Sequence, residues 1–282
     1  MTIPRLVNAQ RFVRKMRGSC HAHLTEADDQ ACYVVKFAQN PQGGRRTLIN
    51  EMLASLLFEA IGVATPEVAY VAVDSRFVQD NPDVSIACGN QRTAVEPGLH
   101  FGSRCPEGDK PVYDFLPDRL FPELYNRRDF LGALAMDKWL SNGDSRQAVF
   151  YRDWIPKCGA ARWVVRMIDH GGSFQGREWT FRNSPAQGVY ARRAVYGDTV
   201  SLRDFEPWLD AISDLRFADL EEAFHLLPGE WIGTDEANLR GVLKALDARR
   251  CQTRAFLAET VGCFWGRHAS HSSLVLKFCA FP

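Results

Sequence analysis

An aspartate at the end of a strongly apolar segment is the first residue whose type and position could do chemistry. Asp169 follows "RWVVRMI" and precedes His170 and two glycines. A carboxylate at the end of a buried strand can bind Mg²⁺, which prefers one or two carboxylates together with substrate phosphates. Gly171 and Gly172 let the backbone behind it reverse and move. An ordinary turn is the other interpretation of these residues.

A second acidic residue follows a predicted helix. In "WLSNGDSRQAVFYRD", Asp144 lies in a loop between a helix and a short strand. A carboxylate on such a frame can orient a hydroxyl group or accept its proton. Gln147 could bind a metal through its amide oxygen. Because Asn-Gly-Asp is also strong turn composition, a capped turn is an equally good interpretation of this stretch alone.

A lysine and a glutamate in the first sixty residues could form an ion pair. Lys36 lies in the apolar strand "CYVVKF", so it must reach solvent or find a negative partner. Glu51 lies near the first turn of a predicted helix, where the helix dipole tolerates a carboxylate. A strand lysine and a helix glutamate can pair across a β-α unit, which would hold the ammonium where it can contact phosphate oxygens.

A glycine between two predicted strands could let backbone N–H groups approach a phosphate. Gly18 occupies this position in "RKMRGSCHAHL", although a plain hairpin turn is the better interpretation of this stretch alone. His21 and His23 alternate along the same stretch. No third ligand is nearby, so we interpret them as a structural or solvent-facing pair and not as a metal site.

The elements that must position these residues are mixed in type. The first hundred residues are rich in strands and contain one helix, in which Thr47 is the expected N-cap and Gly62 the expected stop. The strands are predicted at 11–17, 31–37 and 67–74. A long irregular stretch, 75–118, follows, and we place a lobe boundary near residue 98.

Beyond this boundary the chain is mostly helical. Two short strands, 147–153 and 161–169, interrupt the helical pattern and are joined by the turn "WIPKCGA". Helices are predicted at 127–142, 201–215, 217–227 and 234–264. The sequence therefore predicts an α+β protein, with a β-rich part at 1–98, a mostly helical part at 99–265 and a tail, 266–282, without an assignable pattern.

Composition excludes several classes of protein. The 282 residues carry a formal net charge of +0, so direct nucleic-acid binding is not expected. No apolar run is long enough to span a membrane. The N-terminus does not have the pattern of a secretory signal. Eight scattered cysteines without C-x-x-C spacing indicate a reducing compartment, and we expect the protein in the cytoplasm.

Taken together, the chemical features follow the order of the protein-kinase fold: glycine loop, strand lysine, helix glutamate, loop aspartate with an amide, and strand-end aspartate with glycine. The amino-acid sequence around these features resembles the HipA-like kinase family of bacteria, from about residue 10 to about residue 175. The resemblance rests on "MRGSCHAHL", "YVVKFAQNPQGGRRTLINEMLASLL", "GLHFGSR", "DKWLSNGDSRQAVFYR" and "MIDHGGSF". "MIDHG" also resembles the metal-binding segment of the type II phosphatidylinositol kinases.

The resemblance implies a two-lobed kinase fold that binds ATP and Mg²⁺ between the lobes. It implies that Gly18 and Ser19 lie in a loop that covers the phosphates, and that Lys36, paired with Glu51, binds phosphate oxygens. It further implies that Asp144 is the catalytic residue and that Asp169 and Gln147 bind the metal. Adenine would bind near Leu99 and Phe101. The chain departs from the kinase pattern in several ways. His170 replaces the phenylalanine after the metal aspartate, and the glycine loop has few glycines. Gln147 replaces an asparagine and lies three residues after Asp144, where the usual spacing is five.

A competing alignment to the same pattern uses Asp137 and Asn142, which have the usual five-residue spacing. We prefer Asp144, because Asp137 lies within the helical pattern whereas Asp144 lies in the loop after it.

The resemblance implies transfer of the γ-phosphoryl group of ATP to a hydroxyl group, with a protein Ser or Thr as the expected acceptor and an antitoxin-type regulator as a possible partner. One alternative is a nucleotide-binding pseudokinase that serves as an interaction module. Another is a kinase-fold enzyme that acts on a small molecule or a lipid, or that transfers AMP.

Overall fold

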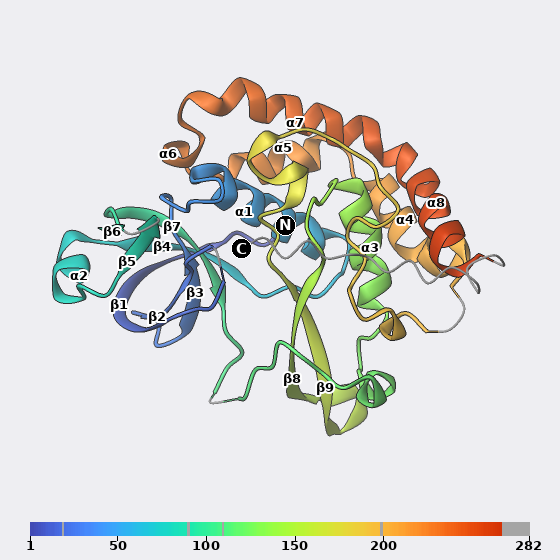
Figure 1. Cartoon of the computed structure of the whole chain (residues 1–282), viewed down its shortest axis with the longest axis horizontal. Helices are drawn as coiled ribbons and strands as arrows, with labels where there is room; N and C mark the ends of the chain where they lie inside the picture. The colour runs from blue at the N-terminus through green and yellow to red at the C-terminus, as the bar shows by residue number, and fades with distance from the viewer. Residues whose placement is uncertain (19, 89–90, 109, 198–199, 267–282) are drawn as a thin grey trace.

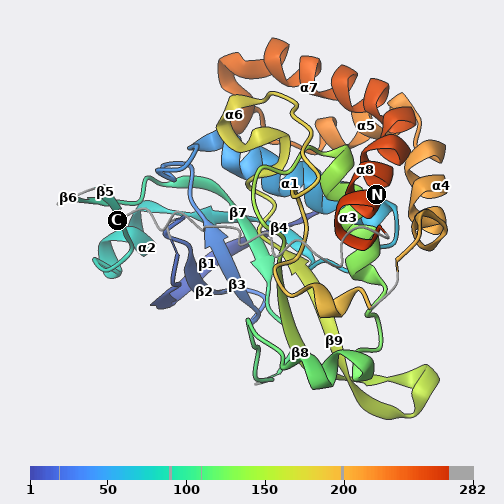
Figure 2. The same ribbon diagram turned by 45° about the vertical axis from the view of Figure 1, so that its right-hand side comes forward.

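The computed structural model describes residues 1–18, 20–88, 91–108, 110–197 and 200–266. A β-barrel formed by the first hundred residues lies beside a larger part built mostly of helices (Figure 1). A long β-hairpin projects away from both parts, as Figure 2 shows from a second direction. These features agree with the predicted α+β class.

The barrel contains five strands, which close in the order β1-β2-β3-β7-β4. Their bounds are Arg5–Lys15 for β1, His23–Ala27 for β2, Cys32–Lys36 for β3, Val68–Val73 for β4 and Gly98–Arg104 for β7. β1 closes the barrel because its first half pairs in parallel with β4 and its second half pairs antiparallel with β2. Alternate residues such as Val7, Val35 and Val71 fill the interior, since successive side chains of a strand point to opposite faces.

Strand β7 differs from our interpretation of 75–118 as irregular. It pairs with both β3 and β4, so the barrel extends beyond residue 98, where we place the lobe boundary from the sequence. The residue pattern of this strand is hard to recognise in the sequence because Gly102 occupies a position where most strands have a larger residue. A Cβ atom at Gly102 would lie 2.5 Å from a methyl group of Val71, so the tight barrel interior requires glycine there. The division of the chain into lobes stays a prediction.

The same stretch also contains three short elements: α2 (Ser75–Asp80), β5 (Ser85–Cys88) and β6 (Gln91–Ala94). Strands β5 and β6 form a separate two-stranded sheet. Phe77, Val84 and Ile86 from this region pack against the barrel core. These elements escape sequence-based recognition because each is too short to show a hydrophobic period.

Helix α1 (Arg45–Ala60) lies between the barrel and the helical part (Figure 1). Every residue from 47 to 58 is buried, which is typical of a helix covered on all sides. Gly44, not Thr47, is its N-cap, so that prediction is wrong by one turn. Gly62 stops the helix as predicted: its φ of 75° and the bond from the Val63 N–H to the Phe58 carbonyl end the helix in the left-handed manner that favours glycine.

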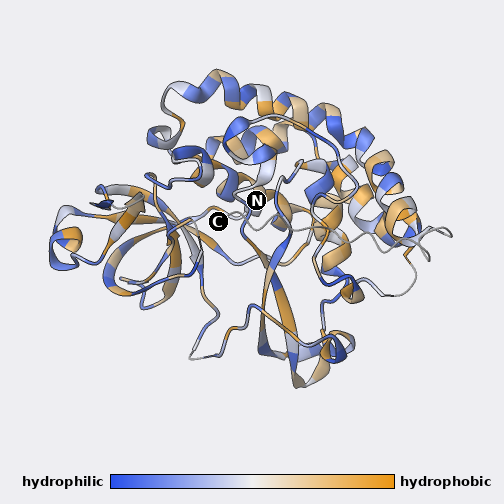
Figure 3. Ribbon diagram, viewed as in Figure 1, coloured by the Kyte–Doolittle hydropathy of each residue, from blue (hydrophilic) through white to orange (hydrophobic). Residues whose placement is uncertain are grey.

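The helical part packs around α3 (Asp129–Trp139), whose residues Phe130 to Trp139 are all buried. The remaining α-helices are α4 (Glu206–Asp214), α5 (Phe217–His225), α6 (Gly229–Ile232), α7 (Glu236–Arg249) and α8 (Thr253–Trp265). Figure 3 shows hydrophilic and hydrophobic residues alternating along α7, as expected of a helix with one face on the core. One continuous apolar cluster joins α1 to these helices. The predicted helical segments at 201–215, 217–227 and 234–264 are confirmed in outline.

The projecting hairpin consists of β8 (Gln147–Ile155) and β9 (Ala160–Ile168). Gly159, with a φ of 59°, lies in the turn between them, as the sequence predicts. Gln147 pairs with Ile168 at the base of the hairpin, which places Gln147 beside Asp169.

None of the helices in the described part of the chain is long and apolar enough to cross a bilayer. Of the predicted C-terminal tail, residues 267–282 lie outside the described residues.

The barrel buries two histidines, which should make its stability fall in acid. His23 lies edge-on between the rings of Phe12 and Phe37, with centroids 5.4 and 4.9 Å away. His100 packs on the other side of Phe37. Burial, assisted by Lys15 at His23, lowers the pKa of each imidazole to about 4. His23 is therefore a core residue, the structural member of the pair predicted with His21.

We expect the free energy of unfolding to decrease as the pH falls from the ordinary histidine value of 6.5 toward 4. Between these pH values the two imidazoles become protonated in the unfolded chain but stay neutral in the folded chain. By pH 5 this difference lowers the free energy of unfolding by about 2 kcal/mol for each histidine. Urea unfolding of wild type and His23→Leu at several pH values tests this. The variant should have a shallower pH dependence; identical slopes would contradict the assignment.

Candidate active site

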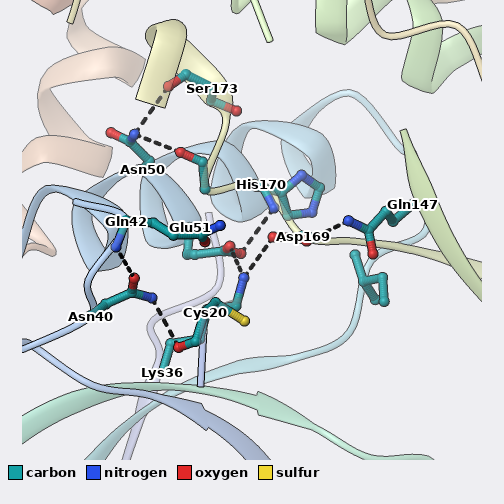
Figure 4. A network of polar contacts seen from close by, with 12 residues as sticks. Cys20, Lys36, Asn40, Gln42, Asn50, Glu51, Gln147, Asp169, His170 and Ser173 are labelled. Atoms are coloured by element: carbon teal, nitrogen blue, oxygen red, sulfur yellow. Dashed lines mark hydrogen bonds and ion pairs between the residues drawn. The ribbon is translucent and has the colours of Figure 1, made fainter. Parts of the chain in front are cut away.

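Three charged side chains from distant parts of the chain meet at one point. Nζ of Lys36, at the end of β3, contacts Oε1 of Glu51 on α1 and lies 2.7 Å from Oδ1 of Asp169, which follows β9. Gln147 donates a hydrogen bond of 2.6 Å to Oδ2 of the same aspartate. Figure 4 shows these side chains pointing toward one another. The predicted lysine, glutamate, aspartate and amide therefore lie together.

The charges of this cluster stabilise one another. Burial alone would lower the pKa of Lys36, but the carboxylates of Glu51 and Asp169 outweigh it and raise that pKa well above its ordinary value. Burial also opposes ionisation of Asp169, but Lys36 and Arg146 hold its pKa below the ordinary value. The Glu51 side chain is only 2% exposed, whereas that of Asp169 is 30% exposed. The cluster thus contains a permanent cation and presents an ionised carboxylate to solvent.

Helix α1 holds the segment that carries Asp169 through two neighbouring side chains. Oε2 of Glu51 accepts a hydrogen bond of 3.0 Å from the backbone N–H of His170. The amide of Asn50 donates to three carbonyl oxygens of this segment, those of Gly171, Ser173 and Gly176. Asp169 itself has a φ of 60°, a conformation that costs a non-glycine residue free energy and persists only where surrounding contacts enforce it. The hydrogen bonds from α1 to the neighbouring residues hold Asp169 in this conformation.

Asp144 lies in the loop between α3 and β8, as predicted, against the backbone of Gly172. A Cβ atom at Gly172 would lie 2.5 Å from Oδ2 of Asp144, so a larger residue there would displace this carboxylate. The side chain is open to solvent, yet partial desolvation by the surrounding protein and the nearby charge of Asp169 raise its pKa. The two carboxylates are therefore close enough to repel each other.

The competing aspartate has a structural role. Asp137 is fully buried and receives two hydrogen bonds, of 2.9 and 2.7 Å, from the guanidinium of Arg146. Asn142 also donates to Asp137, at 2.9 Å. The same guanidinium donates to the carbonyl of Ile168, the residue before Asp169. A carboxylate enclosed in this way cannot reach a substrate, which favours Asp144 over the pair Asp137 and Asn142.

The loop between β1 and β2 approaches Lys36. Gly18 has a φ of 117°, which only glycine adopts readily, and Ser19 lies outside the described residues. The carbonyl of Cys20 accepts a hydrogen bond of 3.2 Å from Asn40, and Cys20 lies beside Lys36 in Figure 4. The predicted glycine loop is thus anchored next to the charged cluster.

The two residues predicted to contact adenine are engaged in packing. The N–H of Leu99 donates to Glu230 and its carbonyl accepts from the Trp231 indole, so α6 uses both backbone groups. Phe101 is 2% exposed and belongs to the core shared with α1. Their contact with a nucleotide stays a prediction.

A comparison with protein families matches this geometry to one of them. The family model described as HipA-like kinase matches residues 10–265. The chain belongs to the HipA-like kinase family. This confirms the resemblance and extends it from about residue 175 through the C-terminal helices. No curated protein sequence matches this HipA-like kinase.

Several solved structures are similar in shape. The structure of hydra Fam20 with sugar has a TM-score of 0.52 at 10% identity, covering 90% of this chain and 86% of that one. The crystal structure of the Golgi casein kinase has a TM-score of 0.48 at 11% identity, covering 92% and 74%. The same kinase with Mn/ADP bound has a TM-score of 0.46 at 11% identity, covering 94% and 74%. The first similarity shows a shared fold, and the family match identifies the chain as a HipA-like kinase.

Sequence reasoning missed two residues that position the site. Asn50 precedes Glu51 in an apolar helix, and a buried amide there needs partners, which is a signal that could have been used. Arg146 lies between Asp144 and Gln147, where an arginine is indistinguishable from a solvent-exposed loop residue. Its complete burial is explained by its contacts with Asp137 and with the carbonyl of Ile168.

Proposed function

We propose that the chain is a cytoplasmic kinase of two lobes that transfers the γ-phosphoryl group of Mg²⁺–ATP to a hydroxyl group, with a Ser or Thr of a protein as the expected acceptor. The convergence of Lys36, Glu51 and Asp169 from three separate elements is the observation that carries the proposal. An ordinary structural ion pair needs only one carboxylate. The second, solvent-facing carboxylate fits a site in which a cation and phosphates bind.

The donor set fits a divalent cation. Asp169 offers an ionised carboxylate, Asp144 lies close to it, and rotating the Gln147 amide by half a turn would present its oxygen. Among the described residues, no three His, Cys, Asp or Glu side chains form a metal cluster, so phosphate oxygens would complete the coordination. A bound Mg²⁺ would neutralise charge on the transferring phosphoryl group.

Each remaining residue then has a role in positioning or proton transfer. Lys36 would bind the α- and β-phosphates while Glu51 holds its ammonium in place. Gly18 and Ser19 would cover the phosphates with backbone N–H groups. Asp144 would orient the acceptor hydroxyl and take its proton, for which a raised pKa is favourable. An antitoxin-type regulator stays an expectation from the family resemblance.

The test is transfer of label from ATP to protein acceptors in the presence of Mg²⁺. With γ-labelled ATP we expect incorporation, and with α-labelled ATP none. Asp144→Asn should lower the rate by about 10²- to 10³-fold and leave nucleotide affinity nearly unchanged. Asp80→Asn, which alters an exposed carboxylate on α2, is the matched control and should retain full activity.

Other outcomes identify the alternatives. Transfer of α-label would replace phosphoryl transfer by AMP transfer. Binding of ATP without transfer of either label, by wild type and Asp144→Asn alike, would indicate a pseudokinase. Label recovered only in a small molecule or a lipid would exclude the protein acceptor.

A further inference from the structure

The hairpin of β8 and β9 connects the candidate active site to an exposed surface. Its base holds Gln147 opposite Ile168, next to Asp169, and its strands remain paired up to Ile155 and Ala160. A strand of this length spans roughly 25 Å. Figures 1 and 2 both show the hairpin extending away from the barrel and from the helices. Positioning Gln147 alone would require only the first residues of this hairpin.

Large aromatic side chains are exposed on the hairpin and beside it. Trp154 is 62% exposed, and Tyr113, which bridges to β8 at Phe150, is 46% exposed. Tyr113 packs edge-on against Trp163 of β9 at 5.7 Å. Arg152 lies directly opposite Trp163 in the register and therefore on the same face as Trp154. Exposed tryptophan, tyrosine and arginine together are typical of protein-binding surfaces.

The hairpin also carries more positive than negative charge. Within 147–168 the cationic residues are Arg152, Lys157, Arg162 and Arg166. The single acidic residue there, Asp153, already accepts a hydrogen bond of 2.7 Å from Lys110. Lys157 and Arg162 are exposed and form no ion pair with any residue that the structure describes. This charge favours a negatively charged partner.

We propose that residues 152–163, the docking hairpin, bind an acidic segment of the protein that accepts the phosphoryl group. The inference rests on the proposed function, and it names the acceptor as a protein with acidic and apolar side chains at a fixed distance from the reacting hydroxyl. Because one pair of strands joins the docking hairpin to Gln147, the bound segment would lie roughly 25 Å from the site, about eight extended residues.

Binding is tested first, with an inactive protein, so that the result does not depend on phosphoryl transfer. The probe is a fluorescein-labelled peptide rich in Asp and Glu with one central Leu, compared with its Asn/Gln counterpart, on the Asp144→Asn protein. We expect the acidic peptide to bind at least about 10-fold more tightly, and salt to weaken it. Arg152→Glu/Lys157→Glu should remove this preference. Trp154→Ala, which keeps the charge, should weaken binding of both peptides and retain the preference. Arg76→Glu, on α2, is the control and should bind normally.

Transfer is tested next, with a Ser peptide that carries the acidic segment about eight residues away. The docking variants should raise KM for this peptide about 10-fold with kcat nearly unchanged, and should leave a short Ser peptide without the segment unaffected. Equal binding of acidic and neutral peptides would overturn the proposal. So would tighter binding of a uridine oligonucleotide or of phosphatidylserine vesicles. If the acidic peptide binds as expected but no label is transferred, the docking surface stands and the proposed kinase activity does not.

Discussion

Replacing Asp169 by asparagine is expected to lower phosphoryl transfer by about 10⁴-fold, equivalent to about 5 kcal/mol of transition-state stabilisation. Of the two carboxylates that contact Lys36, Asp169 is the one that is partly open to solvent, and Lys36 and Arg146 hold its pKa below the ordinary value. The amide of asparagine keeps the shape of the side chain but loses the charge that would hold a divalent cation. Lys36 would keep Glu51 as a partner, so the fold should survive.

The measurement combines activity with thermal unfolding. Wild type with ATP should melt at a higher temperature when Mg²⁺ is present, because a ligand at 100 times its Kd adds about 2.7 kcal/mol to the stability of the folded state. Asp169→Asn should lose the part of this shift that depends on the metal, and Asp80→Asn should keep it. Full activity in Asp169→Asn, or a wild-type shift that is the same with and without Mg²⁺, would refute the metal role.

Breaking the buried pair of Asp137 and Arg146 is expected to destabilise the protein by about 3–5 kcal/mol, a large part of the stability of a typical domain. Both side chains are 0% exposed, so removing Asp137 leaves the Arg146 charge buried without its carboxylate partner. Asp137→Leu is the most direct change. The same guanidinium also supports the backbone before Asp169, so activity should fall even at temperatures where the variant is folded.

Urea unfolding of a double-mutant cycle measures this effect. Asp137→Leu and Arg146→Met should each be strongly destabilising, whereas the double variant should recover part of the loss because no charge is left buried alone. Arg254→Met, which breaks the exposed pair with Glu206, is the control and should change stability little. Single variants as stable as the control would show that the pair contributes nothing to the fold.

Local chemistry made much of the site predictable. Lys36 and Glu51 could be proposed as a pair from the sequence because a lysine in an apolar strand must reach solvent or find an anion, and the next helix offers one. Asp169 could be recognised because a carboxylate between an apolar strand and two glycines is itself an unusual combination. The end of α1 at Gly62 could be placed because a left-handed residue at that position favours glycine.

Contacts between distant residues decided the rest. The sequence offers one carboxylate inside α3 and another in the loop after it, and the position of Arg146 shows that Asp137 is enclosed while Asp144 stays accessible. Strand β7 is hidden from pattern analysis because the need for Gly102 comes from Val71 across the barrel.

The chain by itself therefore determined which side chains could do chemistry, since charge, burial preference and backbone freedom are properties of each residue and its neighbours. Tertiary structure decided which of them meet. The carbonyl partners of Asn50 lie more than a hundred residues away in the chain. No local period in the sequence encodes such pairings, because they arise from how whole elements bury their apolar faces against one another.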